Sequence, residues 1–349
     1  MIAGFLLACI LFSGCTPETK PAGPKFTGRL LFLNGSGPNG SDLIELTPAA
    51  NGATNNLKTI ASGVLEATPS ADLTQLLYAT KDAIILLNLQ TAATKSVVKG
   101  AGFCLAWSPD GKRFSYQEKS GAANSSLKLF VSDLDGRSRM VSEDSSGVER
   151  VDKNCAQWIA PDSLLFDRFA GMVPKNAVSE NVKPNTTTIA VVGESIRFID
   201  SARKWSVEGI CPSGSAILTP ADQSSPILIA KSLEHFERLN PTPGPTEGRF
   251  IGFAAKSCVP FFLTQSISTA SDLFSLNPTS WQRSRTSAIN ETFSPSAKFL
   301  IKSSARLMVA GDAPGKLLLI DTESGDVTPL VESGKGAVSS PVPVVWIEN

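Results

Sequence analysis

The chain has 349 residues, of which 42% are hydrophobic and 18% are charged. Lysine plus arginine and aspartate plus glutamate number 32 each, so the formal net charge at pH 7 is zero. A nucleic-acid-binding face needs clustered basic residues, and the sequence contains no run of five like charges, so we expect no nucleic-acid partner.

The chain begins with a short apolar segment that ends in small residues. Residues 2–12 are apolar apart from one glycine and one cysteine, and Ser13 and Gly14 precede Cys15. About 11 apolar residues fit a secretion signal and fall short of the roughly 20 that span a bilayer. Residues 11–15 resemble the lipobox of bacterial lipoproteins, which implies a lipid on Cys15. The alternative is an ordinary secretion signal that is cleaved nearby, with Cys15 a plain thiol.

A spacer follows the cysteine. Residues 16–24 contain three prolines and one glycine, and such a stretch is typical of an extended tether. Thr16 stands where inner-membrane lipoproteins of the enteric type carry aspartate, so the resemblance favours the outer membrane, facing the periplasm or the cell surface. We predict a signal peptide at 1–14, a lipidated cysteine and tether at 15–26, and a folded domain at 27–349.

The folded domain contains many short apolar runs bounded by glycine, proline, asparagine and aspartate. No stretch of 12 residues keeps the apolar spacing of an amphipathic helix, so the pattern predicts an all-β domain. The runs are Leu30–Leu33, Gln75–Tyr78, Ile84–Leu87, Leu127–Val131, Ile227–Ile229, Phe261–Leu263 and Lys316–Ile320.

The clearest motif is a turn at residues 106–112, which contains Trp107, Ser108, Pro109, Asp110 and Gly111. An apolar strand ends at the tryptophan, the proline fixes the backbone for a turn, and the aspartate and glycine complete it. The motif resembles the repeat signature of TolB-type, WD40-like propellers. That resemblance implies a β-propeller made of repeated four-stranded blades.

Weaker copies of the turn recur along the chain. Their prolines lie at positions 69, 109, 161, 212 and 295, and a strand is expected directly after each turn. A period near 45 residues with four short strands per unit is typical of a propeller blade. The expected units are 64–100, 101–148, 149–209, 210–246, 247–286 and 287–335.

The two ends of the domain are expected to share one further blade. Residues 27–63 supply three strands, and residues 342–346 look like the first strand of a unit, with Trp346 in its place. Pairing them would cover a sheet edge that is otherwise exposed. We predict seven blades closed in this way, with six blades as the alternative, and an all-β sandwich as the competing fold.

Four cysteines remain after the tether. Cys104, Cys155, Cys211 and Cys258 are 51, 56 and 47 residues apart, which is about one blade each. An envelope location permits disulfides, so pairs 104–155 and 211–258 are hypotheses. The alternative is four buried thiols that pack as small apolar groups.

No segment carries a recognisable catalytic or metal site. The only histidine is His235, and the sequence has no Gly-x-Ser-x-Gly, His-Glu-x-x-His or Cys-x-x-Cys motif. The glycine-rich residues 34–41 lack the Lys-Ser/Thr of a phosphate loop, and the aspartates at 133–136 and 321–326 fit hairpin turns better than calcium loops. We therefore predict no catalytic residue, metal or cofactor.

The predicted role is binding. TolB-type propellers bind other envelope proteins, but only a short spacer precedes the first strand here, so their additional N-terminal domain is not expected and their named role does not transfer. We expect a monomeric, non-catalytic scaffold that is held at the membrane by lipid. It would present a loop face, including residues 169–185, to an unidentified envelope protein or the cell wall. The alternatives are a carbohydrate- or peptide-processing propeller enzyme with a site on the channel face, and a ligand-sensing or structural module.

Overall fold

The computed structural model describes most of the predicted domain. The described residues are 25–37, 39–48, 55–120, 126–144, 155–168, 186–191, 196–202, 205–211, 213–220, 227–231, 241–254, 257–265, 270–302, 304–313, 315–331 and 338–348. The predicted signal peptide, Cys15, most of the tether, His235 and residues 169–185 lie outside them, so the predictions for these parts remain predictions.

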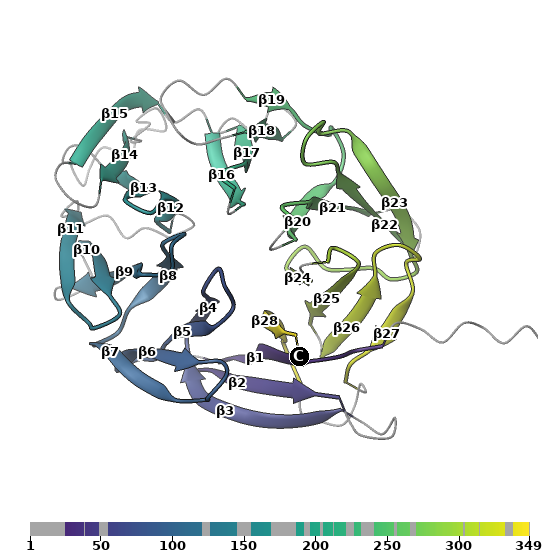
Figure 1. The fold of residues 1–349 in the computed structure, drawn as a ribbon, viewed down its shortest axis with the longest axis horizontal. Helices are drawn as coiled ribbons and strands as arrows, with labels where there is room; N and C mark the ends of the chain where they lie inside the picture. Colours follow the sequence, from purple (N-terminus) through teal and green to yellow (C-terminus); the bar gives the residue numbers. More distant parts are fainter. Residues whose placement is uncertain are drawn as a thin grey trace, which may run out of the picture.

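The described strands form seven antiparallel sheets of four strands each, arranged in a ring (Figure 1). The sheet that joins both chain ends contains β28 (Val342–Ile347), β1 (Arg29–Gly37), β2 (Gly40–Thr47) and β3 (Asn56–Val64). The next three sheets contain β4 (Glu66–Pro69), β5 (Gln75–Ala79), β6 (Ala83–Asn88) and β7 (Thr94–Lys99); β8 (Phe103–Trp107), β9 (Arg113–Ser120), β10 (Ser126–Asp133) and β11 (Ser138–Asp144); and β12 (Gln157–Ala160), β13 (Ser163–Arg168), β14 (Thr186–Val191) and β15 (Ile196–Ala202). The last three contain β16 (Trp205–Ile210), β17 (Ala216–Pro220), β18 (Leu228–Ala230) and β19 (Thr242–Pro243); β20 (Arg249–Phe253), β21 (Pro260–Gln265), β22 (Ser271–Leu276) and β23 (Arg283–Ile289); and β24 (Lys298–Ile301), β25 (Leu307–Asp312), β26 (Lys316–Asp321) and β27 (Val327–Pro329).

In each sheet one edge strand lies toward the middle of the ring (Figure 1). These inner strands are β28, β4, β8, β12, β16, β20 and β24. Since the same strand order repeats around the ring, all inner strands begin at one mouth of the ring and end at the other. The all-β propeller predicted from the sequence is therefore confirmed.

The hydrophobic core is divided among the contacts between neighbouring sheets. Seven buried clusters occur among the described residues, and each joins one sheet to the next around the ring. A middle strand is therefore covered on both faces, which explains why β26 is an unbroken apolar run, buried from Leu317 to Asp321, rather than an alternating one. The short apolar runs of the sequence are strands of this kind.

Closure by the two chain ends is also confirmed. β28 pairs antiparallel with β1, placing Trp346 opposite Leu30 and Val345 opposite Leu31. The Trp346 indole donates a hydrogen bond to the Thr27 carbonyl at 2.8 Å, and its ring lies 5.3 Å from that of Phe26. The first and last strands thus hold each other by both backbone pairing and side-chain packing.

One of the predicted repeat turns lies at a different place in its sheet. A strand follows Ser294 and Pro295 as predicted, but this strand is β24, the first of its sheet, whereas the turn at residues 108–111 lies between the first and second strands of its sheet. The difference depends on tertiary structure, because Ser294 bonds to Asp312, on the second strand, rather than to an aspartate within its own turn. After β24, the Ala305 N–H donates a hydrogen bond to the Lys302 carbonyl at 2.8 Å, as in a turn.

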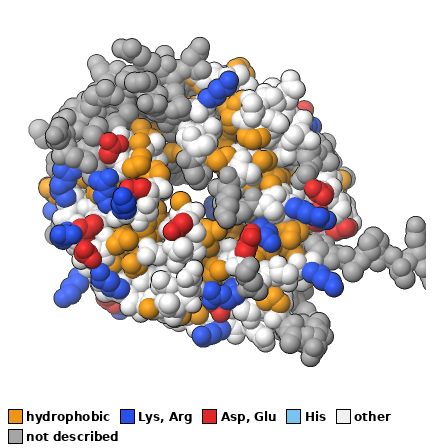
Figure 2. All heavy atoms as spheres, viewed as in Figure 1, with side chains coloured by type: hydrophobic (Ala, Val, Ile, Leu, Met, Phe, Trp, Pro, Cys, Tyr) orange, Lys and Arg blue, Asp and Glu red, His pale blue; other side chains and the backbone are white. Residues whose placement is uncertain are grey.

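The surface matches the balanced composition. Side chains of both charge signs are interspersed over the face shown in Figure 2, without a large field of one sign. Among the described residues there is no helix of the length and hydropathy needed to cross a membrane.

Candidate ligand-binding site

The predicted turn motif is a closed hydrogen-bonded unit. The buried Ser108 hydroxyl lies 2.7 Å from an Asp110 carboxylate oxygen, and the Arg113 backbone N–H donates to the same hydroxyl at 3.0 Å. Ser70 and Asp72 repeat the arrangement in the preceding sheet, where their bond is 2.6 Å long. This hydrogen bond from Ser70 is the main reason why the pKa of Asp72 lies below its ordinary value. Because the same unit recurs in two sheets, these serines and aspartates are turn-forming groups.

The tryptophans near these turns bind the neighbouring sheet. The Trp107 indole donates to the Thr68 carbonyl at 3.0 Å, and the Trp158 indole donates to the Ala106 carbonyl at 3.1 Å. Arg113 adds a bond to the Pro161 carbonyl at 2.7 Å, with its guanidinium carbon 5.9 Å from the centre of the Trp158 ring. These hydrogen bonds hold both indole rings in place, and they leave neither indole N–H free to bind a ligand.

A groove of about 290 Å³ lies between these tryptophans, where the inner strands end. It crosses four neighbouring sheets and brings together four of the residues singled out from the sequence, namely Trp107, Ser108, Pro109 and Cys211. Its walls are mostly apolar, and they are formed by Thr68, Pro69, Ala71, Leu105, Ala106, Trp107, Ser108, Pro109, Trp158, Ile159, Ile210, Cys211 and Gly214. Asp110 and Gly111 belong to the adjoining turn and do not line it.

A half-buried carboxylate, for which the sequence offers no signal, fixes the backbone at one side of the groove. Glu66, on β4, accepts a hydrogen bond from the Leu105 N–H at 3.1 Å. Burial raises the pKa of Glu66, although the bonds from the Cys104 and Leu105 N–H groups oppose the rise. Nothing in the local sequence distinguishes this glutamate, because its role arises only when β4 and β8 become neighbours.

The four cysteines form two bonds between neighbouring sheets. Cys104 is joined to Cys155 with a Cα–Cα distance of 5.1 Å, and Cys211 is joined to Cys258 at 5.5 Å. Both distances lie within the ordinary disulfide range. In each pair one cysteine has a positive φ, 55° at both Cys104 and Cys258, a conformation that costs a non-glycine residue about 1–2 kcal/mol.

The acidic turns considered for calcium have internal partners. Asp133 accepts bonds from the backbone N–H groups of Asp135 and Arg137, and Asp321 accepts them from Glu323 and Ser324. Within the described part of the chain, no three histidine, cysteine, aspartate or glutamate side chains gather as a metal site would require.

Comparisons with known proteins identify the fold. No family model and no curated protein matches the chain. Among solved structures, the propeller domain of the Trilobed protease from Pyrococcus furiosus is similar over 90% of this chain and 98% of that domain, with 10% identity and a TM-score of 0.53. The acylaminoacyl peptidase of Pyrococcus horikoshii matches at 10% identity and a TM-score of 0.49, over 88% of this chain and only 50% of the peptidase. An oligogalacturonate lyase from Vibrio parahaemolyticus matches at 10% identity and a TM-score of 0.36, over 84% of this chain and 72% of the lyase.

The match to the Pyrococcus furiosus domain supports a β-propeller fold and does not single out the TolB type. The prediction that the chain is not an enzyme is corrected, because the propeller fold of the first match occurs in a protease and this fold therefore does not exclude catalysis. That prediction relied on short catalytic motifs. A site assembled from several blades leaves no such motif in any one segment, so the lack of motifs was not sufficient evidence.

Proposed function

We propose that the protein is a lipid-anchored β-propeller of the bacterial cell envelope, with each of the seven sheets forming one blade. In this proposal it takes part in peptide processing by binding apolar stretches of peptide in the groove between Trp107 and Trp158. The observation that carries the proposal is the groove itself, whose aromatic walls are fixed by hydrogen bonds to neighbouring blades. The turn motif at residues 106–112 supports the resemblance to TolB-type repeats.

The groove suits an apolar peptide better than a carbohydrate. Sugar hydroxyls need several polar partners, whereas the polar side-chain oxygens of the groove's described lining belong to Thr68 and Ser108, and the Ser108 hydroxyl is already bonded. Indole, proline and isoleucine side chains instead gain free energy by covering apolar side chains, at about 25 cal/mol per Å² buried. Because the groove crosses four blades, it is long enough for a peptide to bind in an extended conformation.

A blocked pentapeptide, acetyl-Leu-Pro-Leu-Pro-Leu-amide, tests this proposal because it has no charged ends. We expect it to shift the tryptophan fluorescence of the full-length protein. Ile159→Thr should weaken its binding about tenfold, since a lost apolar contact of about 1.4 kcal/mol corresponds to that factor. Met140→Thr is the matched control, because Met140 is exposed on β11 and is not part of the groove. Equal affinity of the Ile159→Thr and Met140→Thr proteins, or preferential binding of a chitin trisaccharide, would contradict the proposal.

The lipid anchor is tested in the cell. Cys15→Ser should abolish the incorporation of labelled palmitate and release the protein from membranes. Cys9→Ser, within the apolar segment, should leave both properties unchanged. Labelling that survives Cys15→Ser would show that Cys15 does not carry the lipid.

A further inference from the structure

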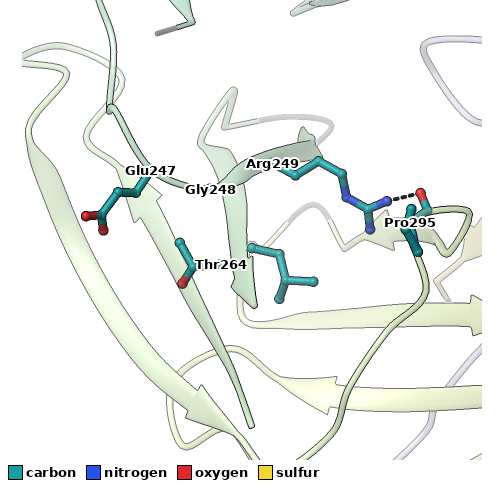
Figure 3. Close-up of a pocket in the computed structure, with 6 residues that line it drawn as sticks. Glu247, Gly248, Arg249, Thr264 and Pro295 are labelled. Carbon is teal, nitrogen blue, oxygen red and sulfur yellow. Dashed lines mark hydrogen bonds between the residues drawn. The ribbon is translucent and has the colours of Figure 1, made fainter. Parts of the chain in front are cut away.

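A second cavity, drawn in Figure 3, is lined by residues at the opposite mouth of the ring, where the inner strands begin. Its volume is about 480 Å³. Arg249 opens β20, Thr264 lies near the end of β21, and Pro295 precedes β24, so all three lie at this end of their sheets. The cavity is lined by Glu247, Gly248, Arg249, Leu263, Thr264 and Pro295.

Arg249 is held rigidly at one side of this cavity. Its guanidinium donates a hydrogen bond to the Pro295 carbonyl, and its central carbon lies 5.7 Å from the centre of the Phe299 ring. The loop that carries Pro295 is itself fixed, because the backbone N–H and hydroxyl of Ser294 bond to Asp312 at 2.8 and 2.5 Å. A guanidinium has five N–H donors. Among the described residues the Pro295 carbonyl is its one hydrogen-bond acceptor, so donors are left for a ligand.

An acid lies across the cavity from this cation. Figure 3 shows Glu247 and Arg249 pointing to opposite sides, with Thr264 between them. Glu247 is exposed, and its carboxylate has no hydrogen bond or ion pair with the described residues. Gly248 separates the two charged residues on the chain at a φ of +94°, where a Cβ would lie 2.9 Å from the Phe274 ring, so only glycine fits there without displacement.

We propose that this cavity binds a short peptide with free ends, the carboxylate on Arg249 and the ammonium group on Glu247. An arginine fork is suited to a carboxylate, and its fixed position lowers the entropy lost on binding. Glu247 repels a second negative charge, so phosphate and polycarboxylate ligands are disfavoured. The Thr264 methyl group offers apolar contact to the middle of the ligand. The site goes beyond the proposed function, because it recognises charged ends rather than an apolar stretch and lies at the other mouth.

Calorimetric titration of the full-length protein with trialanine tests the inference. Acetyl-trialanine, which lacks the ammonium group, and trialanine amide, which lacks the carboxylate, should each bind at least tenfold more weakly. Arg249→Gln and Glu247→Gln should weaken trialanine binding by a similar factor, since each removes a charge-assisted hydrogen bond to one end of the peptide. Arg113→Gln is the matched control, because Arg113 makes the same two contacts, with a proline carbonyl and an aromatic ring, between two other sheets.

The outcomes separate this inference from the groove. Ile159→Thr should leave trialanine binding unchanged, whereas the blocked pentapeptide should be indifferent to Glu247→Gln. Glu247 is exposed, so this variant tests the site even if Arg249→Gln proves unstable. The inference is overturned if trialanine does not bind at millimolar concentration, if the blocked forms bind equally well, or if galacturonic acid binds more tightly than trialanine.

Discussion

Single polar side chains hold neighbouring blades together by hydrogen bonds to backbone carbonyls. The indoles of Trp107 and Trp158 each donate to a backbone carbonyl of the preceding sheet. Trp281 differs, because its buried indole nitrogen has no hydrogen-bond partner among the described residues. The same residue type therefore occurs with and without this bond in one molecule.

This contrast gives a direct measure of the bond between blades. Trp107→Phe should destabilise the protein by about 1–2 kcal/mol more than Trp281→Phe, because only the first leaves a bonded carbonyl without its donor. Urea unfolding of the two variants and the parent supplies the comparison. Equal losses of unfolding free energy in both variants would show that the Trp107 bond adds nothing beyond packing of the ring.

The raised pKa of Glu66 predicts that the stability of the folded protein depends on pH. Burial raises the pKa of Glu66 in the folded protein above its ordinary value of 4.5, so the ionised form is disfavoured by folding. Below that value the group is protonated in both states. As the pH rises from 4.5 through the folded pKa, the unfolded state loses its proton first and the protein loses stability.

A variant without the Glu66 charge should not lose stability as the pH rises. Glu66→Gln keeps an oxygen that can accept the Leu105 N–H bond, so we expect a higher urea midpoint than the parent at pH 7 and a similar midpoint at pH 4. Glu247→Gln, at an exposed position, should change neither. A Glu66→Gln protein that is less stable than the parent at pH 7 would mean that the hydrogen bonds to the carboxylate outweigh the cost of burying its charge.

At the scale of elements, the terminal strand β28 closes the ring. Val344, Val345 and Trp346 are buried, and burial of a large apolar side chain contributes about 1.5–3 kcal/mol. Their side chains pack into the clusters on both sides of the shared sheet. β28 therefore completes the sheet of β1–β3 and also packs against both neighbouring sheets, that of β4–β7 and that of β24–β27.

Deleting residues 341–349 should lower the urea midpoint and broaden the unfolding transition, because Leu30 and Leu31 lose their cover. A synthetic peptide of residues 338–349 should restore part of the loss. Deletion of residues 348 and 349 alone is the control, since it keeps β28 whole. A sharp transition of undiminished midpoint in the longer deletion would show that β28 does not close the ring in solution.

The disulfides belong to the scale of the whole molecule. One joins the sheet of β8 to that of β12, and the other joins the sheet of β16 to that of β20, so each bond spans one contact between blades. The paired cysteines are 51 positions apart in the sequence in the first case and 47 in the second. Closing loops of this length in the unfolded chain is worth about 4 kcal/mol each in the chain-entropy model.

Replacing one pair by serines should therefore lower the unfolding free energy by up to that amount, and the two double variants should lose similar amounts. Peptide mass spectrometry without reductant should recover the linked peptides 104–155 and 211–258. Four free thiols in the purified protein would exclude both bonds.

The sequence by itself determined the fold class, the paired chain ends and most of the repeat turns. Each of these depends on neighbours in the chain or on a period, such as the turn at Ser108 and Asp110. It did not determine the turn near Pro295, because Ser294 takes its partner from β25. The environment of Glu66, the groove and the Arg249 cavity arise from tertiary contacts that no segment of the sequence indicates. Each combines residues from different blades, and closing the ring brings those residues together.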